Sequence, residues 1–264
     1  MRLATWNVNS LNARLPRVEE WLTLAEPDVV CLQETKLAND AFPALTFEAL
    51  GYQSVHHGHG QWNGVAILSR VGLEDADVDF ADGGEADRDA RLVWATCGGV
   101  RVASAYVPNG RSPDDDHYQY KLEWLGRLVD HLGQACTPDQ PVVVAGDYNI
   151  APEDRDVWDI SAFEGATHVT EPERSRLAEL ADWGLIDVFR SRYPDDDGLY
   201  SYWDYQAGRF HKREGMRIDL VLATRPLEAG LGRVLVDRNA RKGEKPSDHA
   251  PVVVEFDDEV IAAC

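Results

Sequence analysis

The sequence is short of cysteine and methionine, and it has no long apolar run. Its four cysteines contain no Cys-x-x-Cys pair, so we expect neither a zinc site nor a disulfide framework. No segment is apolar over the length that spans a bilayer, and the first residues do not have the pattern of a signal peptide. We therefore expect a cytoplasmic protein that makes no contact with membranes.

Internal repeats and linker-like segments are also missing. A chain of 264 residues with 44% hydrophobic content can bury one sizeable core. These features predict a single catalytic domain over residues 1–264, and we expect it to be a monomer.

Basic residues are scarce, because 46 acidic residues stand against 26 basic ones and leave a formal net charge of -20. A charge of this sign repels a polyphosphate at long range. The basic residues gather at Arg88, Arg91 and Arg111 and within the segments 209–217 and 238–245. Two explanations stay open: a basic working face with an acidic back, or adaptation of the host to high internal salt, which shortens electrostatic repulsion.

Short apolar runs alternate with segments of helical spacing. The runs predict eight strands, at 3–6, 29–32, 65–68, 92–96, 102–106, 142–145, 218–223 and 252–256. The spacing predicts helices over 11–25, 118–132 and 175–183. This alternation indicates a layered α/β fold.

Acids, amides and one imidazole stand at the ends of these runs. They are Asn7, Glu34, Asp147, Asn149, Asp219, Asp248 and His249. Carboxylates and an imidazole at one rim suit the meeting of a divalent cation and a phosphoryl group. Taken singly, each position is equally compatible with an ordinary turn or a solvated loop residue.

The motifs taken together resemble the exonuclease III family of DNA-repair nucleases. The matching segments run in the family's order from residue 2 to residue 256, and they are 6–7, 32–36, 106–110, 146–152, 203–205, 216–219 and 247–251. The wider superfamily includes sphingomyelinases, inositol-phosphate 5-phosphatases and RNA deadenylases, which share the acid and amide residues. The segments 183–190 and 200–205 are similar to the exonuclease III branch in particular.

The resemblance implies a four-layer α/β/β/α sandwich, in which two packed mixed β-sheets are flanked by helices and the active site lies in a cleft at one edge. It also implies a Mg²⁺-dependent phosphodiesterase, with Mn²⁺ as a substitute, that incises duplex DNA 5′ to abasic sites and removes nucleotides or blocking groups from 3′ ends. Two alternatives remain: a phosphoesterase of the same superfamily that acts on RNA or a small phosphate ester, and a binding module that has lost the chemistry.

By the same resemblance, Glu34 is the main metal ligand, and the predicted set is Asn7, Glu34, Asp147, Asn149, Asp248 and His249. Asp147 orients or deprotonates the attacking water, and Asn149 hydrogen-bonds the phosphate. Asp219 fixes the tautomer of His249, which contacts the phosphate or moves a proton. Tyr106 donates to the phosphate or to the leaving oxygen.

The residues predicted to bind substrate are Arg91, Asn109, Arg111, Tyr202, Trp203, Met216, Arg217 and Ile218. The arginines are equally compatible with solvated loop positions, and the apolar residues with the core. Some relatives carry a large aromatic residue where this chain has Met216. A flexible thioether at that position is expected to loosen the discrimination between an abasic sugar and a normal nucleotide.

Overall fold

The structure is a computed structural model that describes residues 1–264, and it contains two six-stranded β-sheets. The first sheet has the strand order β11 (Leu231–Val236), β12 (Val252–Phe256), β1 (Arg2–Asn7), β2 (Val29–Gln33), β4 (Val65–Ser69) and β3 (Gln53–His57). The second has the order β5 (Glu74–Val78), β6 (Leu92–Cys97), β7 (Val100–Tyr106), β8 (Val142–Asp147), β10 (Asp219–Thr224) and β9 (Leu185–Asp187).

Each sheet has one parallel pair near its centre, β1 with β2 and β7 with β8, and the other pairings are antiparallel. The α-helices are α1 (Leu11–Ala25), α2 (Ala44–Ala49), α3 (Asp116–Ala135), α4 (Glu171–Trp183), α5 (Val188–Arg192), α6 (Arg209–Lys212) and α7 (Asp258–Ala263). Short 3₁₀ helices occupy 39–41, 154–156, 160–163, 206–208, 225–230 and 238–241. None of the helices is both long and apolar enough to cross a membrane.

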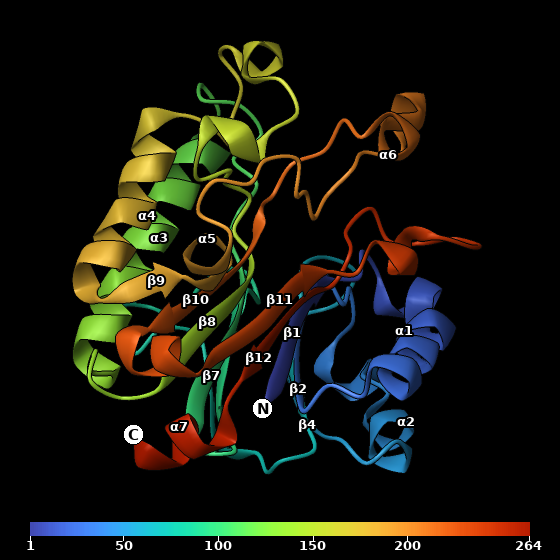
Figure 1. Cartoon of the computed structure of the whole chain (residues 1–264), viewed down its shortest axis with the longest axis vertical. Coiled ribbons are helices and arrows are strands. Elements are labelled where there is room, and N and C mark those ends of the chain that lie inside the picture. Colours follow the sequence, from blue (N-terminus) through green and yellow to red (C-terminus); the bar gives the residue numbers. More distant parts are fainter.

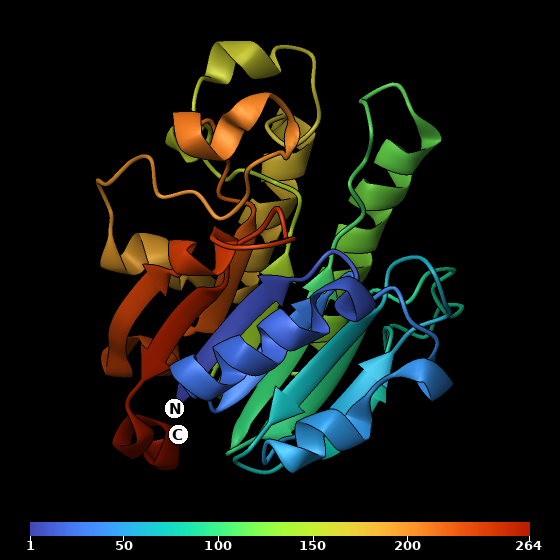
Figure 2. The same ribbon diagram turned by 90° about the vertical axis from the view of Figure 1, so that its right-hand side faces the viewer.

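The layers are helices, sheet, sheet and helices, as the resemblance implied (Figure 1). Helices α3 and α4 cover the outer face of the second sheet, and α1 and α2 cover the outer face of the first. Figure 2 turns α1 and α2 toward the viewer, with α6 and the loops around it rising above them. The predicted four-layer fold is therefore confirmed.

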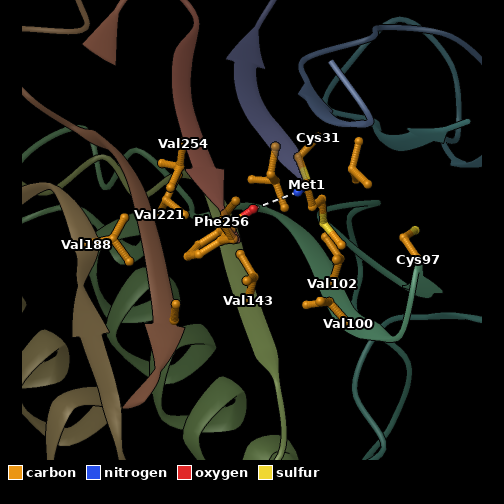
Figure 3. Close-up of a cluster of buried hydrophobic side chains, with 14 of the residues drawn as sticks. Met1, Cys31, Cys97, Val100, Val102, Val143, Val188, Val221, Val254 and Phe256 are labelled. Atoms are coloured by element: carbon orange, nitrogen blue, oxygen red, sulfur yellow. Dashed lines mark hydrogen bonds between the residues drawn. The ribbon is translucent and has the colours of Figure 1, made fainter. Parts of the chain in front are cut away.

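The central core lies between the two sheets and explains the continuous apolar runs. Along β2, Val29 and Cys31 face the second sheet, whereas Val30 and Leu32 face the helices. A strand buried on both faces has no polar alternation to show. Figure 3 shows side chains of both sheets in this core, together with the amino group of Met1, which donates to the carbonyl oxygen of Phe256 at 2.7 Å.

The core becomes polar toward one end of the sandwich. Thr5 donates to the side-chain oxygen of Gln33 at 3.2 Å, and Gln33 donates in turn to Ser104 at 3.0 Å, all three being fully buried. This hydrogen-bonded layer lies just below the rim at which β1, β2, β7 and β8 end. The rim is the end of the sandwich opposite the two chain termini (Figure 1).

Candidate active site

The predicted site residues converge on this polar rim from both sheets. Asn7 ends β1 and Asp147 ends β8, while Asp219 begins β10 directly opposite Asp147 in the antiparallel register. Glu34 follows β2, and His249 precedes β12. The fold thus brings together five side chains that lie up to 242 residues apart in the sequence.

The Asn7 amide connects carboxylates that belong to different sheets. Its Nδ2 donates to Glu34 Oε1 and to Asp147 Oδ2, both at 2.9 Å. Its Oδ1 accepts from the backbone N–H of Asn9 at 2.9 Å, so the orientation of the amide is set by the chain itself. The two carboxylates are therefore held beside each other before any ligand binds.

Glu34 stays ionised although it is largely buried. Burial opposes its ionisation, but the Lys36 ammonium at 2.9 Å and the Asn7 amide outweigh this and lower the pKa of Glu34. Lys36 also donates to Asn9 Oδ1 at 2.6 Å, and Asn9 donates to Asp248 Oδ1 at 3.1 Å. A single chain of hydrogen bonds thus links Glu34 to Asp248.

His249 lies between two buried carboxylates. Its Nδ1 contacts Asp219 Oδ2 at 2.8 Å, and its Nε2 lies 3.8 Å from Asp147 Oδ2. Burial alone would lower the pKa of His249, but Asp219 and Asp147 together raise it to about 10. The imidazole is therefore protonated at neutral pH, with Nδ1–H directed at Asp219.

The pKa of Asp147 is raised, whereas that of Glu34 is lowered, so the Asp147 carboxyl titrates close to neutrality. Its Oδ1 accepts from the backbone N–H of Asn149 at 2.9 Å. Burial raises the pKa of Asp147 to about 7, against the lowering effect of His249. A carboxylate with such a pKa can accept a proton at neutral pH.

Tyr106, Asn109 and Asn149 form the neighbouring wall. Asn109 Nδ2 donates to Asn149 Oδ1 at 3.0 Å, and Asn149 Nδ2 donates to the carbonyl of Val107 at 3.0 Å. Burial and the nearby Glu34 carboxylate raise the pKa of Tyr106 well above its ordinary value, so the phenol remains a proton donor. The Arg91 guanidinium lies over the Tyr106 ring at 4.7 Å.

Backbone strain gathers at the same rim. Five non-glycine residues of the site loops have left-handed backbone angles: Asn9 (φ 42°), Ser10 (φ 86°), Glu34 (φ 53°), Lys36 (φ 53°) and Asn149 (φ 52°). Such conformations cost energy and persist only where surrounding contacts enforce them. Five of the fourteen non-glycine residues with positive φ thus lie in the site loops, which supports a functional role independently of charge.

The donor set suits a hard divalent cation. Oxygen or nitrogen atoms of Asp147, Asp219 and His249 lie within 4.8 Å of one another, and Glu34 is joined to Asp147 through Asn7. The buried Oδ1 of Asp219 has no hydrogen-bond partner. Carboxylate and amide oxygens are the ligands that Mg²⁺ and Mn²⁺ prefer.

Two hollows flank the catalytic residues. A groove of about 960 Å³ begins at Tyr106 and Asn109, and it is lined further out by Trp62, Arg88, Arg91, Arg111 and His117. A smaller pocket of about 290 Å³ contains Tyr202, whose ring lies 4.8 Å from that of His249. Met216, His168, Trp158 and Phe163 also line this pocket.

Three of the predicted substrate contacts lie elsewhere. Arg217 is fully buried and donates to both oxygens of Asp156 and to Asp187, so its guanidinium is engaged with carboxylates away from the surface that a substrate would meet. Trp203 packs against Phe210 and Ala250, and Ile218 packs behind Met216. In this structure these three residues support the site, whereas Tyr202 and Met216 line the pocket.

The expected basic working face is only partly present. Arg91 is paired with Asp89 at 3.0 Å, and the exposed Arg111 lies 3.7 Å from Asp115. The large groove contains Asp89 and three consecutive acids, 114–116, beside its three arginines. The acids that partly neutralise the arginines are their neighbours in the sequence, so the charge of this face is mixed and not simply basic.

Several residues of the site were not singled out by the sequence. Lys36 and Asn9 connect Glu34 with Asp248; Lys36 stands within the segment 32–36, and Asn9 lies two residues after the segment 6–7. Ser201 accepts from the backbone N–H groups of Ile218 and Asp219 at 3.2 and 3.1 Å, and it thereby supports the start of β10. A serine distant in the sequence gives no local signal of such a contact.

Comparisons with known proteins agree with this geometry. Residues 4–249 match the model of the Endonuclease/Exonuclease/phosphatase family. The chain is 32% identical to exodeoxyribonuclease III of Haemophilus influenzae over 97% of this chain and 100% of that protein. Its structure is similar to that of an AP endonuclease from Archaeoglobus fulgidus, with a TM-score of 0.93, 37% identity and coverage of 97% and 99%. It is also similar to the 3′ phosphatase NExo from Neisseria bound to product DNA hairpin, with a TM-score of 0.92, 37% identity and coverage of 97% and 99%.

Proposed function

The chain belongs to the endonuclease/exonuclease/phosphatase family, and from this we propose how its rim of carboxylates cleaves DNA. It is a DNA-repair phosphodiesterase of the exonuclease III type, as the sequence motifs predicted. The observation that carries the mechanism is the arrangement around His249, which lies between Asp219 and Asp147 while Asn7 joins Asp147 to Glu34.

We propose that the substrate is duplex DNA that carries abasic sites or 3′ ends. The similar proteins named above include an AP endonuclease and a 3′ phosphatase bound to DNA. The proposed activity of this protein is to incise the DNA strand 5′ to the abasic site and to remove nucleotides or blocking groups from 3′ ends. Residues 1–264 act as one catalytic domain, because strands from both ends of the chain build the sheet that carries Asn7 and Glu34. We propose the cytoplasm as its compartment.

Asp147 is the proposed base. Its pKa of about 7 allows it to take a proton from the attacking water, while Asn7 and the Asn149 backbone N–H keep its oxygens in place. His249, protonated and held by Asp219, donates from Nε2 to a non-bridging phosphate oxygen. Tyr106 donates its phenolic proton toward the phosphate or the departing oxygen, and Asn149 donates to the phosphate.

A divalent cation, with Mg²⁺ proposed and Mn²⁺ as a substitute, would neutralise charge on the phosphate oxygens. Glu34 is its main proposed ligand, because the carboxylate is ionised and lies beside Asn7 and Asp147. Asp248 and Asn149 remain candidates for the same ion. A protonated imidazole has no lone pair for a metal, so the raised pKa of His249, together with the contact of its Nδ1 with Asp219, favours phosphate contact over metal ligation.

The two hollows are proposed to bind different parts of the substrate. Tyr202 and Met216 contact the sugar that replaces an intact nucleotide, in the pocket beside His249. Arg91, Asn109 and Arg111 lie along the large groove, where guanidinium and amide groups are suited to phosphates of the flanking strand.

The test uses an end-labelled duplex with one abasic analogue beside an undamaged duplex with a recessed 3′ end. Each is incubated with Mg²⁺, with Mn²⁺ and with chelator, over a range of salt concentrations. We expect metal-dependent incision at the lesion and metal-dependent digestion of the 3′ end. Absence of cleavage of both DNAs at every salt concentration, together with turnover of RNA or a small phosphate ester, would contradict the proposal.

A further inference from the structure

Behind the wall formed by Asn109 and Asn149 lies a fully buried lysine that the proposed mechanism does not use. Lys121 belongs to α3, and its side chain has an exposed fraction of 0%. Its Nζ donates to the carbonyl oxygen of Asn149 at 2.7 Å and to that of Asn109 at 3.2 Å, and it forms an ion pair with Glu173. An ammonium has three protons, so these three acceptors satisfy it.

The two carboxylate oxygens of Glu173, the partner of Lys121, accept hydrogen bonds from different groups. Its Oε2 accepts from the backbone N–H of Thr170 at 3.0 Å and so caps the start of α4. Its Oε1 faces the other way, toward Lys121, and accepts from Thr167 Oγ1 at 2.6 Å and from the backbone N–H of His168 at 2.9 Å. Capping requires Oε2 alone, so the contacts of Oε1 call for a second explanation.

The same two asparagines are therefore held on both sides. Their side chains pair at the front of the wall, where Asn109 donates to Asn149 at 3.0 Å, and one ammonium binds their carbonyls at the back. Asn149 needs this support because its backbone is left-handed. Packing around Lys121 is tight, since a Cβ added at Gly110 would lie 2.9 Å from Thr167 Oγ1 and 3.1 Å from Lys121 Cδ.

We propose that Lys121 and Glu173 are a positioning pair, which fixes the backbones of Asn109 and Asn149 so that the Asn149 amide meets the phosphate in the transition state. This inference rests on the proposed function. An apolar pair fills a buried space as well as an ion pair does, so packing alone does not explain a buried charge here. An ammonium offers what a methyl group does not, namely three donors aimed at two carbonyls and a carboxylate. Neither residue touches the reacting atoms.

Lys121→Met tests the proposal, because it keeps the length of the side chain and removes its donors. We expect kcat to fall by about 10- to 100-fold, since small displacements of positioning groups have effects of this size, while KM changes less than about twofold. The matched control is Arg127→Met on the same helix, which removes an ion pair with Asp82 and touches none of the site loops named above. Its kcat should remain that of the wild type.

A double-mutant cycle separates positioning from general destabilisation. If Lys121 acts through Asn149, adding Lys121→Met to Asn149→Ala should cost less than about threefold in single-turnover rate at a temperature where all variants are folded. Should Lys121→Met fail to fold, Glu173→Gln, which keeps the capping oxygen, enters the same cycle. Full additivity, or a wild-type kcat in the folded variant, would overturn the proposal. Failure of the proposed function is distinct, because wild type and Arg127→Met would then be inactive as well.

Discussion

One cluster of buried charge lies on the second sheet and its loops, and another lies where that sheet meets the loop before β12; the two differ in how completely their atoms are paired. In the first, Asp156 binds Arg217 through both of its oxygens, and the third nitrogen of Arg217 binds Asp187. In the second, His249 is bonded to Asp219 on one side, but its Nε2 is 3.8 Å from Asp147 and Asp219 Oδ1 has no partner.

Both clusters are buried, so the completeness of their hydrogen bonding distinguishes a structural cluster from a functional one more clearly than burial does. Desolvating a charge is costly, and the Asp156–Arg217 cluster offsets that cost because each nitrogen of Arg217 donates to a carboxylate. The cluster around His249 leaves atoms unpaired beside two hollows, and it shifts the pKa of Asp147 to about 7 and that of His249 to about 10. Unpaired, strongly shifted groups at a cleft are characteristic of sites that bind a ligand.

The largest expected effect comes from breaking the incomplete cluster. His249→Gln removes the charged imidazole, so kcat on the abasic duplex should fall by about 10²- to 10⁴-fold. The circular dichroism spectrum should be unchanged, since Ser201 still holds the backbone at the start of β10. A variant that is folded and turns over at the wild-type rate would show that His249 has no part in the chemistry.

Breaking the Asp156–Arg217 cluster should lower stability and leave kcat nearly unchanged. Arg217→Met leaves Asp156 buried without its main partner, which costs about 3–5 kcal/mol in the free energy of unfolding. Urea denaturation measures this loss, and kcat of the folded fraction at low temperature should stay within about threefold of wild type. If stability is unchanged while KM for DNA rises, Arg217 is the substrate contact that its place in the sequence suggested.

The two clusters should also respond to pH in opposite directions. The pKa of His249 is raised from 6.5 to about 10, so its contribution to stability is complete below pH 6.5 and is lost as the pH rises to 10. The pKa of Asp156 is lowered by Arg217 and Arg190, which outweigh burial, so its contribution is present above pH 3.8 and is lost in acid.

Thermal unfolding in chelator between pH 6 and 10 tests the alkaline half of this statement. One proton that is bound in the folded state and released on unfolding gives a slope of at most about 1.4 kcal/mol per pH unit. The wild type should lose stability across this range, in part through Asp147 with its pKa of about 7, and His249→Gln should lose less stability than the wild type between pH 8 and 10. Parallel curves for the two proteins would assign the pH dependence to other groups.

The sequence predicts the strands at the centre of each sheet and misses those at the edges. Central strands such as β2 and β8 are buried on both faces, which gives an unbroken apolar run. The edge strand β5 is exposed at every position and reads Glu-Asp-Ala-Asp-Val, so no hydrophobic pattern marks it. Another edge strand, β11, is interrupted by an irregular register against β12.

The same limit applies to the two charge clusters. Asp147, Asp219 and His249 stand in motifs at the ends of apolar runs, so their convergence was predictable. The pairing of Arg217 was not predictable, because Asp156 and Asp187 lie 61 and 30 residues away in the sequence. A long-range ion pair leaves no local trace in the sequence, so the resemblance alone makes Arg217 a substrate contact.

Met216 lies between the two clusters, and its substitution is the test with the smallest expected effect. Its backbone exchanges hydrogen bonds with Tyr202 at 2.9 and 3.0 Å, next to His249, and the following residue is Arg217. Its side chain lines the small pocket and packs on Ile218. It therefore connects the Asp156–Arg217 cluster to the wall of the small pocket, which contacts the proposed substrate.

Met216→Leu replaces a flexible thioether with a branched side chain of similar volume, so stability should change by less than about 1.5 kcal/mol. A stiffer wall should exclude intact nucleotides better. The ratio of kcat/KM on the abasic duplex to that on a recessed 3′ end should rise by about threefold, less than the tenfold that a whole methylene produces in an apolar pocket. Ile218→Leu, a change behind the wall, should leave the ratio unaltered. If both variants shift the ratio equally, discrimination depends on the packing behind the pocket and not on the surface that Met216 presents.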